Sequence, residues 1–511
     1  MAVAAVEERQ LLKTLRWYDG FVIALANPGF LLGSLGYSVL DLGGWGAMML
    51  WGITAFFAVF LNVIYSELAA MFPEKPGGIA LLAHEGWRKY TTLVGPVVTF
   101  GYWIAWSVVL AIFGILIGQF VQAEWFPGQP LGTPFDAGWF SMPDLPLFGG
   151  VDIGLPHVIA TGLIVLVWLF NILGVRVSVG FGYGAGVLLM LPLFAFIILP
   201  YLTGDFDSVN LTYKLNDGTG AATAWGGWQL ALVWVWLMTW SAWGVDVCAT
   251  FAPEYKDTVN DTKLALRSAA VFSLLVYTFL PLGMVGAGGE EAVSGYLYTD
   301  VLAKLVGDGA ANFFVLCLIA SFLISMNTAT ADGGRALYGI ARDGMTVKQL
   351  YHLNRFHVPA RAMTIDMVVN ILFVWFFGNI LLILAASNLG YVLAHFFAVT
   401  AFLLLRRDRP AWPRPIKLSR AWIYIAFVLA AICLVLTVVG FGWFQIAAGG
   451  YGSGADAKVV GIASLVIGLL LFLFRRIVQD KQAPHWREDT PSVPEEAVAP
   501  TPTSAAPVAG R

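Results

Sequence analysis

Twelve long apolar runs constrain this chain more than any other feature of its sequence. A run of about 20 apolar residues is long enough to cross a bilayer. Inside hydrocarbon the backbone must satisfy its own hydrogen bonds, so each run is predicted to be a membrane helix. The predicted spans lie near Tyr18–Leu40, Trp45–Met71, Leu93–Val121, Pro156–Leu173, Val177–Tyr201, Gly227–Ala252, Leu264–Ala287, Asn312–Ile340, Met363–Phe377, Ile380–Leu405, Ala421–Phe441 and Val459–Phe474.

Composition agrees with an all-α polytopic membrane protein in a lipid bilayer. The chain is 59% hydrophobic and 12% charged, whereas a soluble domain carries about 25% charge. A net charge of −3 indicates no nucleic-acid partner. Cys248, Cys317 and Cys433 lie in apolar runs without paired spacing, so neither a disulfide framework nor a metal cluster is predicted. No clustered catalytic set and no continuous polar pore are found, so neither an enzyme nor a channel is expected, and no cofactor.

The distribution of Lys and Arg predicts the orientation. If the N-terminus is cytoplasmic, 26 of the 29 basic residues fall on the cytoplasmic side. Only Lys214, Lys304 and Lys458 fall outside. The positive-inside rule therefore predicts that both termini are cytoplasmic. Residues 1–17 show no signal-peptide cleavage pattern and are predicted to stay as a cytoplasmic segment.

The sixth span is interrupted near its middle. Ser241 and Gly244 break the apolar run, and the carboxylate of Asp246 follows two residues later. An acid near mid-membrane costs roughly 2.5–3.5 kcal/mol on insertion scales, so it is rare without a partner or a wet cavity. Backbone that is freed from a helix is tolerated only where it lines a cavity inside the protein. We interpret this stretch as one wall of a binding site.

The first span carries a second interruption. Asn27–Gly29 contains a Pro-Gly pair, which removes a backbone donor, and the small residues Gly33–Gly36 follow. A tight helix-packing face built from small residues is the alternative interpretation. The two interrupted spans are five apart, so a second copy of a five-span unit must enter the membrane from the opposite face. This indicates a five-plus-five inverted repeat, with broken helices 1 and 6 meeting near the midplane.

The spans and loops together predict a domain organisation. It comprises a cytoplasmic segment (1–17), a first five-helix repeat (18–202), an extracellular loop (203–226), a second inverted repeat (227–405), helices 11 and 12 (406–479) and a disordered cytoplasmic tail (480–511).

Several motifs resemble those of the amino acid–polyamine–organocation (APC) permeases, of the bacterial amino acid permease type. Trp240–Asp246 resembles the sixth helix of that family, and Tyr65–Gly78 resembles its second helix and following loop. Glu254–Lys256 resembles its acidic-lysine motif. Arg335–Tyr338 with Ala341–Gly344 resembles the end of its eighth helix.

The sequence departs from the family pattern at four places. Ile79–Leu82 stand where a tyrosine often follows the Gly-Gly pair. The glycine-serine-glycine run of the first helix is extended by one residue, Leu35. Asp257-Thr258 replaces the usual Asn-Pro after the acidic-lysine motif. Leu188–Met190 is apolar where some proton-coupled relatives carry a lysine.

The resemblance implies a secondary transporter, a symporter or an exchanger, that moves amino acids or related amines across the plasma membrane by alternating access. The alternative function is a membrane-embedded sensor that binds the same ligands without transporting them. Trp240 would close over the substrate as a lid, or else be an ordinary packed tryptophan. The candidate substrate-binding residues are Asn27, Gly29, Gly33, Ser34, Gly36, Trp240, Ser241, Trp243 and Gly244.

Coupling and gating candidates are fewer. Any proton coupling would run through Asp246 or another carboxylate. Ser325, Thr328 and Thr330 carry oxygens of the type that binds sodium in some relatives, although hydroxyls in helices also bond back to their own turn. A coupling ion, if one is used, would be H⁺ or Na⁺. The substrate identity and the oligomeric state stay open.

Three other polar residues in the spans are interpreted mainly as structural. Glu67 and Asp332 are expected to pair with nearby Arg or Lys. His395 is expected to be a packing histidine bonded to a carbonyl rather than a proton carrier.

Overall fold

The structure is a computed structural model that describes residues 10–126, 139–145, 149–214, 227–295, 298–377, 380–447 and 454–491. Within these ranges the chain is mostly helical. The helices are α1 (Trp17–Ala24), α2 (Ala26–Met71), α3 (Gly78–Trp87), α4 (Val94–Ser107), α5 (Val109–Trp125), α6 (Leu155–Ile172), α7 (Val175–Thr203), α8 (Gly227–Ala242), α9 (Thr258–Gly288), α10 (Glu290–Ser294), α11 (Tyr298–Val306), α12 (Asp308–Arg342), α13 (Ala360–Phe376), α14 (Ile380–Asp408), α15 (Ala421–Trp443) and α16 (Gly454–Phe474).

Ten helical segments within the described ranges are long and apolar enough to cross a membrane. The first of them, Trp17–Met71, spans two predicted runs in 55 residues. Gly43 divides it, because its φ of 70° lies in the left-handed region that favours glycine. α13 has 17 residues, is shorter than each of these ten segments and is not one of them. Each of the twelve predicted runs is therefore helical in the structure. The number of candidate segments is ten because one of them covers two runs and α13 is too short to be included.

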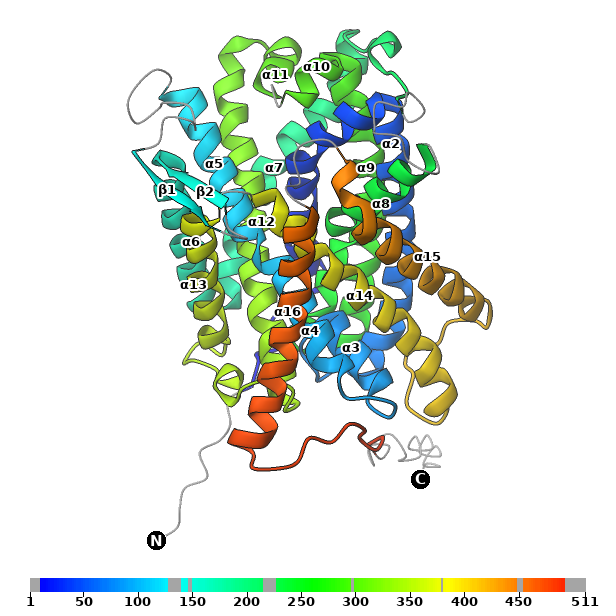
Figure 1. The fold of residues 1–511 in the computed structure, drawn as a ribbon. Coiled ribbons are helices and arrows are strands. Elements are labelled where there is room, and N and C mark those ends of the chain that lie inside the picture. The colour runs from blue at the N-terminus through cyan, green and yellow to red at the C-terminus, as the bar shows by residue number, and fades with distance from the viewer. Residues whose placement is uncertain are drawn as a thin grey trace, which may run out of the picture.

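The interrupted segments lie side by side in the centre of the bundle. In the segment Gly227–Glu254, which contains α8, 94% of the most apolar 18-residue window is buried. In Ala455–Gln479, at the periphery, the buried share of the corresponding window is 22%. The 3₁₀ helix η3 (Gly244–Ala249) continues from α8 and contacts both α1 and α2. α2 packs most extensively against α9, and α12 packs against α2, α4, α5 and α7. In Figure 1, α8 lies beside α9 and α14, with α15 and α16 next to them.

Part of the long loop predicted between the third and fourth spans forms a β-hairpin. Strands β1 (Phe140–Leu145) and β2 (Gly149–Ile153) pair antiparallel, with Phe140 opposite Ile153. The fold is therefore helical with one small two-stranded sheet, which the all-α prediction did not include. The rest of that loop, residues 127–138, lies outside the described residues.

The helix α3 closes one end of the bundle beneath η3, opposite the end that carries α10 and α11 (Figure 1). A Cβ at Gly78 would lie 2.3 Å from Thr250 Oγ1, which follows η3. At Gly339 on α12 a Cβ would lie 2.1 Å from the carbonyl oxygen of Pro76. Gly339 is required because the atom at this distance belongs to the backbone, and Gly78 is required because its φ of 56° is a conformation that favours glycine. The Gly-Gly motif thus lets the loop before α3 press against two interior helices.

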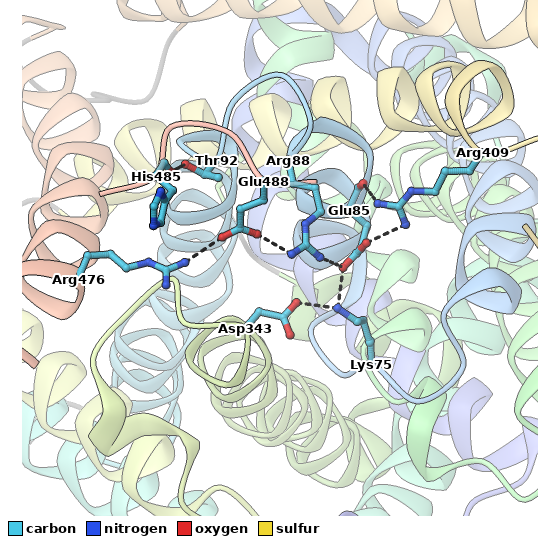
Figure 2. A network of polar contacts seen from close by, with 9 residues as sticks. All are labelled: Lys75, Glu85, Arg88, Thr92, Asp343, Arg409, Arg476, His485 and Glu488. Atoms are coloured by element: carbon cyan, nitrogen blue, oxygen red, sulfur yellow. Dashed lines mark hydrogen bonds and ion pairs between the residues drawn. The ribbon is translucent and has the colours of Figure 1, made fainter. Parts of the chain in front are cut away.

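A network of charged side chains holds α3 in place (Figure 2). The Glu85 carboxylate is 1% exposed and accepts from Lys75 Nζ at 2.6 Å, Arg88 Nη1 at 3.0 Å and Arg409 Nη1 at 3.0 Å. Lys75 also binds Asp343, at the end of α12, at 2.9 Å. Burial alone would raise the pKa of Glu85, but these cations, with Lys75 the strongest, lower it to about 2.

The chain after α16 joins the same network. Glu488 bridges Arg88, at 2.5 Å, and Arg476, at 2.9 Å (Figure 2). The backbone N–H of Thr92 donates to the carbonyl of Trp486 at 3.0 Å. A disordered tail was predicted from residue 480, whereas the structure places residues 482–488 in specific contact with the chain after α3. Residues 492–511 lie outside the described residues.

Candidate functional site

The discontinuity in the first span lies at Leu25, just before the predicted stretch. Leu25 is the cap between α1 and α2, and its N–H is shared between carbonyls of the preceding turn, including those of Phe21 and Val22. Residues 26–36 are helical, so the predicted break at Asn27–Gly36 is corrected to Leu25. Pro28 is tolerated because it falls in the first turn of α2, where N–H groups have no intrahelical partner.

Asn27 compensates for that proline. Pro28 has no N–H to donate to the Ala24 carbonyl, and the Asn27 side chain donates to this carbonyl instead, at 2.8 Å. The arrangement leaves Asn27 Oδ1 buried and without a partner. An asparagine beside a proline therefore stabilises the end of α1 and presents an acceptor to the interior.

The interruption predicted in the sixth span is present. α8 ends at Ala242, and the chain continues through Trp243 into the tighter turns of η3. The interruption lies against the first span, since a Cβ at Gly244 would be 2.2 Å from Asn27 Oδ1. It would also be 3.4 Å from the ring of Trp106 on α4, whose indole nitrogen has no partner. Gly244 thus allows the two interrupted spans to touch.

A tyrosine that the sequence analysis missed connects these spans. The Tyr277 hydroxyl on α9 donates to the Asn27 carbonyl at 2.7 Å and accepts from Ser241 at 2.6 Å. Tyr277 and Asn27 are 0% exposed, and Ser241 is 1% exposed. A tyrosine within an apolar run gives no sequence signal that separates this role from ordinary packing.

Hydroxyl groups of α12 bind the same discontinuity from the other side. Ser325 donates to the Ala26 carbonyl at 2.7 Å, and Thr328 donates to the Ile23 carbonyl at 3.0 Å. Thr330 bonds back to its own turn, through the Met326 carbonyl at 3.1 Å. Of the three hydroxyls proposed for sodium, two therefore lie at the discontinuity and one does not.

The remaining small residues on α2 serve close packing. A Cβ at Gly29 would lie 2.4 Å from Ser325 Oγ and 2.5 Å from the Ser321 carbonyl oxygen. At Gly33 it would lie 2.8 Å from the Phe113 ring. Ser34, which is half-buried, and Gly36, which is buried, lie on the following turn of the helix. The structure thus brings Gly29 to α12 and Gly33 to α5.

Both candidate tryptophans are packed, and their indole N–H groups are bonded. Trp240 donates to the Ala105 carbonyl at 2.9 Å, and its ring lies 5.0 Å from that of Phe30 on α2. Trp243 donates to the Thr54 carbonyl at 3.0 Å and packs edge-on against His395. Trp240 therefore covers α2 beside the discontinuity, a position that suits either a lid or a packed side chain.

The acidic residue of the sixth span lies in η3. Asp246 Oδ1 accepts from the Tyr391 hydroxyl on α14 at 2.9 Å, while Oδ2 has no partner. Asp332 on α12 accepts from Tyr102 on α4 at 3.3 Å, and its second oxygen is also unpaired. The expectation that Asp332 would pair with a basic residue is not met among the described side chains.

Of the other two structural interpretations, the one for Glu67 agrees with the structure, and the one for His395 differs in its bonding partner. Glu67 pairs with Arg406 and Arg414, as expected for a structural carboxylate. His395 Nδ1 instead hydrogen-bonds the Tyr65 hydroxyl at 2.7 Å, so its partner is a side chain rather than the expected carbonyl.

Two of the sequence motifs meet below η3. Glu254, in the short helix η4 (Ala252–Glu254), pairs with Arg335 on α12, and both side chains are 1% exposed. The neighbouring Tyr255 forms a bridge with Leu15, ahead of α1. These contacts join the chain after η3 to α12 and to the segment ahead of α1. Among the described residues no three acidic, histidine or cysteine side chains are grouped to hold a metal ion.

The comparison with known families decides the class of the chain. Residues 18–473 match the amino acid permease family. The chain belongs to this family. The resemblance seen in its motifs is thereby confirmed.

Individual relatives are transporters of amino acids or amines. The chain is 25% identical to a putative arginine/ornithine antiporter of Escherichia coli (strain K12), over 70% of the chain and 74% of the relative. It is 24% identical to the polyamine transporter PUT1 of Oryza sativa subsp. japonica, over 91% and 76%. It is 21% identical to the glutamate/serine transporter AimA of Bacillus subtilis (strain 168), over 80% and 74%. This permease is therefore a multi-pass membrane transport protein and not an enzyme.

Proposed function

We propose that this permease is a secondary active transporter that moves amino acids or related amines across the plasma membrane by alternating access. Its twelve spans would form the five-plus-five inverted repeat, with two further helices, and both termini would be cytoplasmic. The observation that carries the proposal is the Tyr277 hydroxyl, which bonds both Ser241 and the Asn27 carbonyl. It holds the two interrupted spans against each other in the buried centre of the bundle.

The binding site would lie between these spans. A zwitterionic ligand supplies an acceptor for free N–H groups and a donor for free oxygens, so it can satisfy both walls at once. Asn27 Oδ1 and Trp106 Nε1 are an acceptor and a donor that have no partner beside Gly244. Trp240 would close over the ligand from the side of Phe30.

Uptake of radiolabelled amino acids and amines into proteoliposomes tests the function directly. Imposed proton or sodium gradients identify the coupling ion, and preloaded liposomes separate exchange from symport. Accumulation against a concentration gradient supports the proposal. Binding without any uptake, in liposomes where the protein is correctly inserted, would contradict it, as a sensor would behave in this way.

Asp246 is the proposed coupling carboxylate, because it is fully buried in η3. The Asp246→Asn variant is expected to lose dependence on a pH gradient if protons are coupled there. A variant whose remaining transport keeps the full dependence would remove Asp246 from this role.

The orientation has its own test. A reporter fused after Arg511 is expected to report a cytoplasmic location, and single cysteines in the Gln122–Leu155 loop are expected to react with an impermeant reagent from outside. Reaction of that loop only after permeabilisation would contradict the orientation.

A further inference from the structure

Two buried carboxylates near the interrupted sixth span each have one oxygen without a partner. Asp246 and Asp332 are both 0% exposed. Each accepts one hydrogen bond from a tyrosine hydroxyl, and Oδ2 of each is unpaired. A buried charge of this kind is normally paired or fully hydrogen-bonded.

The two carboxylates share one environment. Tyr391, which donates to Asp246, and Tyr102, which donates to Asp332, lie with ring centroids 6.0 Å apart. The Tyr102 hydroxyl is also 3.5 Å from Thr250 Oγ1, four residues after Asp246. A charge on Asp332 raises the free energy of a charge on Asp246.

No basic side chain neutralises this pair within the described part of the chain. Neither carboxylate takes part in an ion pair there. Arg335 lies three residues after Asp332 on α12, but its guanidinium binds Glu254 and the Ala331 carbonyl. A bound cation would balance the charge of the pair, and protonation of the carboxylates is the alternative way to remove that charge.

A third unpaired acceptor, on a different element, points into the same break. Asn27 Oδ1 on α2 is buried, has no partner, and lies 2.2 Å from the position of a Cβ at Gly244. Gly244 precedes Asp246 by two residues. Unpaired oxygens from three elements thus surround η3.

We propose that Asp246 and Asp332 bind an ammonium group of the substrate, so that the preferred substrates are basic amino acids or diamines. An ammonium carries three N–H donors and no acceptor, which matches a set of unpaired oxygens. A divalent cation such as Ca²⁺ or Mg²⁺ fits less well, because it takes about six or more oxygen ligands. The inference rests on the proposed transport function and names the substrate class of that site.

A matched pair of probes isolates the ammonium group. Lysine and norleucine share the α-amino acid group and a four-carbon side chain, and only lysine carries the terminal ammonium. Uptake of each into proteoliposomes, and thermal stabilisation of the purified protein by each, are measured. We expect lysine to be bound at least ~10-fold more tightly than norleucine, the size of one charge-assisted hydrogen bond. Butane-1,4-diamine and butylamine repeat the comparison without a carboxylate.

Variants then locate the contact. Asp246→Asn and Asp332→Asn are expected to weaken lysine binding ~10-fold or more, while norleucine binding changes by less than about 2-fold. Asp261→Asn is the matched control. Asp261 is a buried carboxylate on α9 that accepts from the backbone N–H groups of Trp17 and Asp257, and its replacement is expected to leave both affinities unchanged.

The outcomes separate this inference from the proposed function. The ammonium site is overturned if norleucine is taken up as well as lysine. It is also overturned if the Asp246 and Asp332 variants lose binding of lysine and norleucine equally. Neither result contradicts the proposed transport function. A third result would also overturn the ammonium site. If transport requires sodium, if this requirement disappears in the two variants, and if lysine and norleucine are handled equally, the pair binds an inorganic cation. Failure of every probe to bind or be transported overturns both proposals.

Discussion

The Arg335 guanidinium and the Glu254 carboxylate form a buried, two-pronged ion pair. Arg335 Nη2 lies 3.0 Å from Glu254 Oε2, Nε binds the other carboxylate oxygen, and both side chains are 1% exposed. The guanidinium also lies over the Phe251 ring at 4.4 Å. This pair joins the eighth span to the chain that follows η3.

Removing one member of that pair should destabilise the protein strongly. Glu254→Gln leaves the Arg335 charge buried without compensation, at an expected loss of about 3–5 kcal/mol in the free energy of unfolding. Removing both charges, in Glu254→Leu/Arg335→Leu, should recover part of the loss. The measurement is thermal unfolding in detergent. Glu74→Gln breaks an exposed pair with Lys13 and should cost about 1 kcal/mol or less. Equal effects of the two single variants would contradict the prediction.

Tyr277→Phe should impair transport more than folding. The change removes the hydroxyl that bonds Ser241 and the Asn27 carbonyl, and leaves two buried groups unpaired, at about 1–3 kcal/mol. We expect insertion to be retained and the rate of uptake to fall. Tyr183→Phe is the control. Tyr183 lies on α7 and is exposed, and its hydroxyl donates to Asp19 on α1. Full uptake by Tyr277→Phe would show that the bridge does not position the site.

Gly29→Ala tests the close approach of α2 and α12. The new methyl group would lie 2.5 Å from the Ser321 carbonyl oxygen, so the helices must separate. Overpacking of this kind typically costs about 1–3 kcal/mol. Gly180→Ala on α7 is the matched control, since nothing lies within 4 Å of its added methyl group. The two melting temperatures should differ clearly, and equal values would argue against tight packing at Gly29.

The Glu85 network predicts an acid-dependent loss of stability. The pKa of Glu85 is lowered from 4.5 to about 2, so its charged form stabilises the fold at pH values above 4.5 by about 3 kcal/mol. This contribution is lost as the pH falls from 4.5 through 2. Glu85→Gln should therefore melt well below the parent at pH 7, and the gap should narrow as acid is added. A gap that is independent of pH over this range would exclude the ionised Glu85 as its cause.

Glu488 should attach the chain after α16 to the α3 end. Glu488→Gln weakens two ion pairs, with Arg88 and Arg476, whose side chains are 13–19% exposed. We expect a loss of about 1 kcal/mol, and faster proteolysis of residues after Gln479. Glu74→Gln serves again as an exposed carboxylate without a role in this network. Unchanged protease sensitivity would mean that the backbone bonds to Thr92 hold the segment by themselves.

Several differences between prediction and structure have one physical origin. Asn27 and Pro28 marked a disturbed helix correctly, but the Asn27 side chain replaces the missing bond and moves the discontinuity to Leu25. A tail that is rich in Pro and Glu looked disordered, yet Glu488 finds two arginines from distant parts of the chain. In both cases a side chain satisfies a group that local sequence leaves unpaired.

The sequence by itself determined the class of this protein, because length, hydropathy and charge act locally. Runs of apolar residues must be helical in a bilayer, and the motifs around Ser241, Glu254 and Arg335 were sufficient to indicate the family. Only the tertiary structure decided which polar groups meet. Asp246 and Asp332 are 86 positions apart in the sequence, and only the packing of Tyr391 against Tyr102 places them in one environment. Such contacts depend on how helices pack, and the hydropathy of a single helix carries no record of its neighbours.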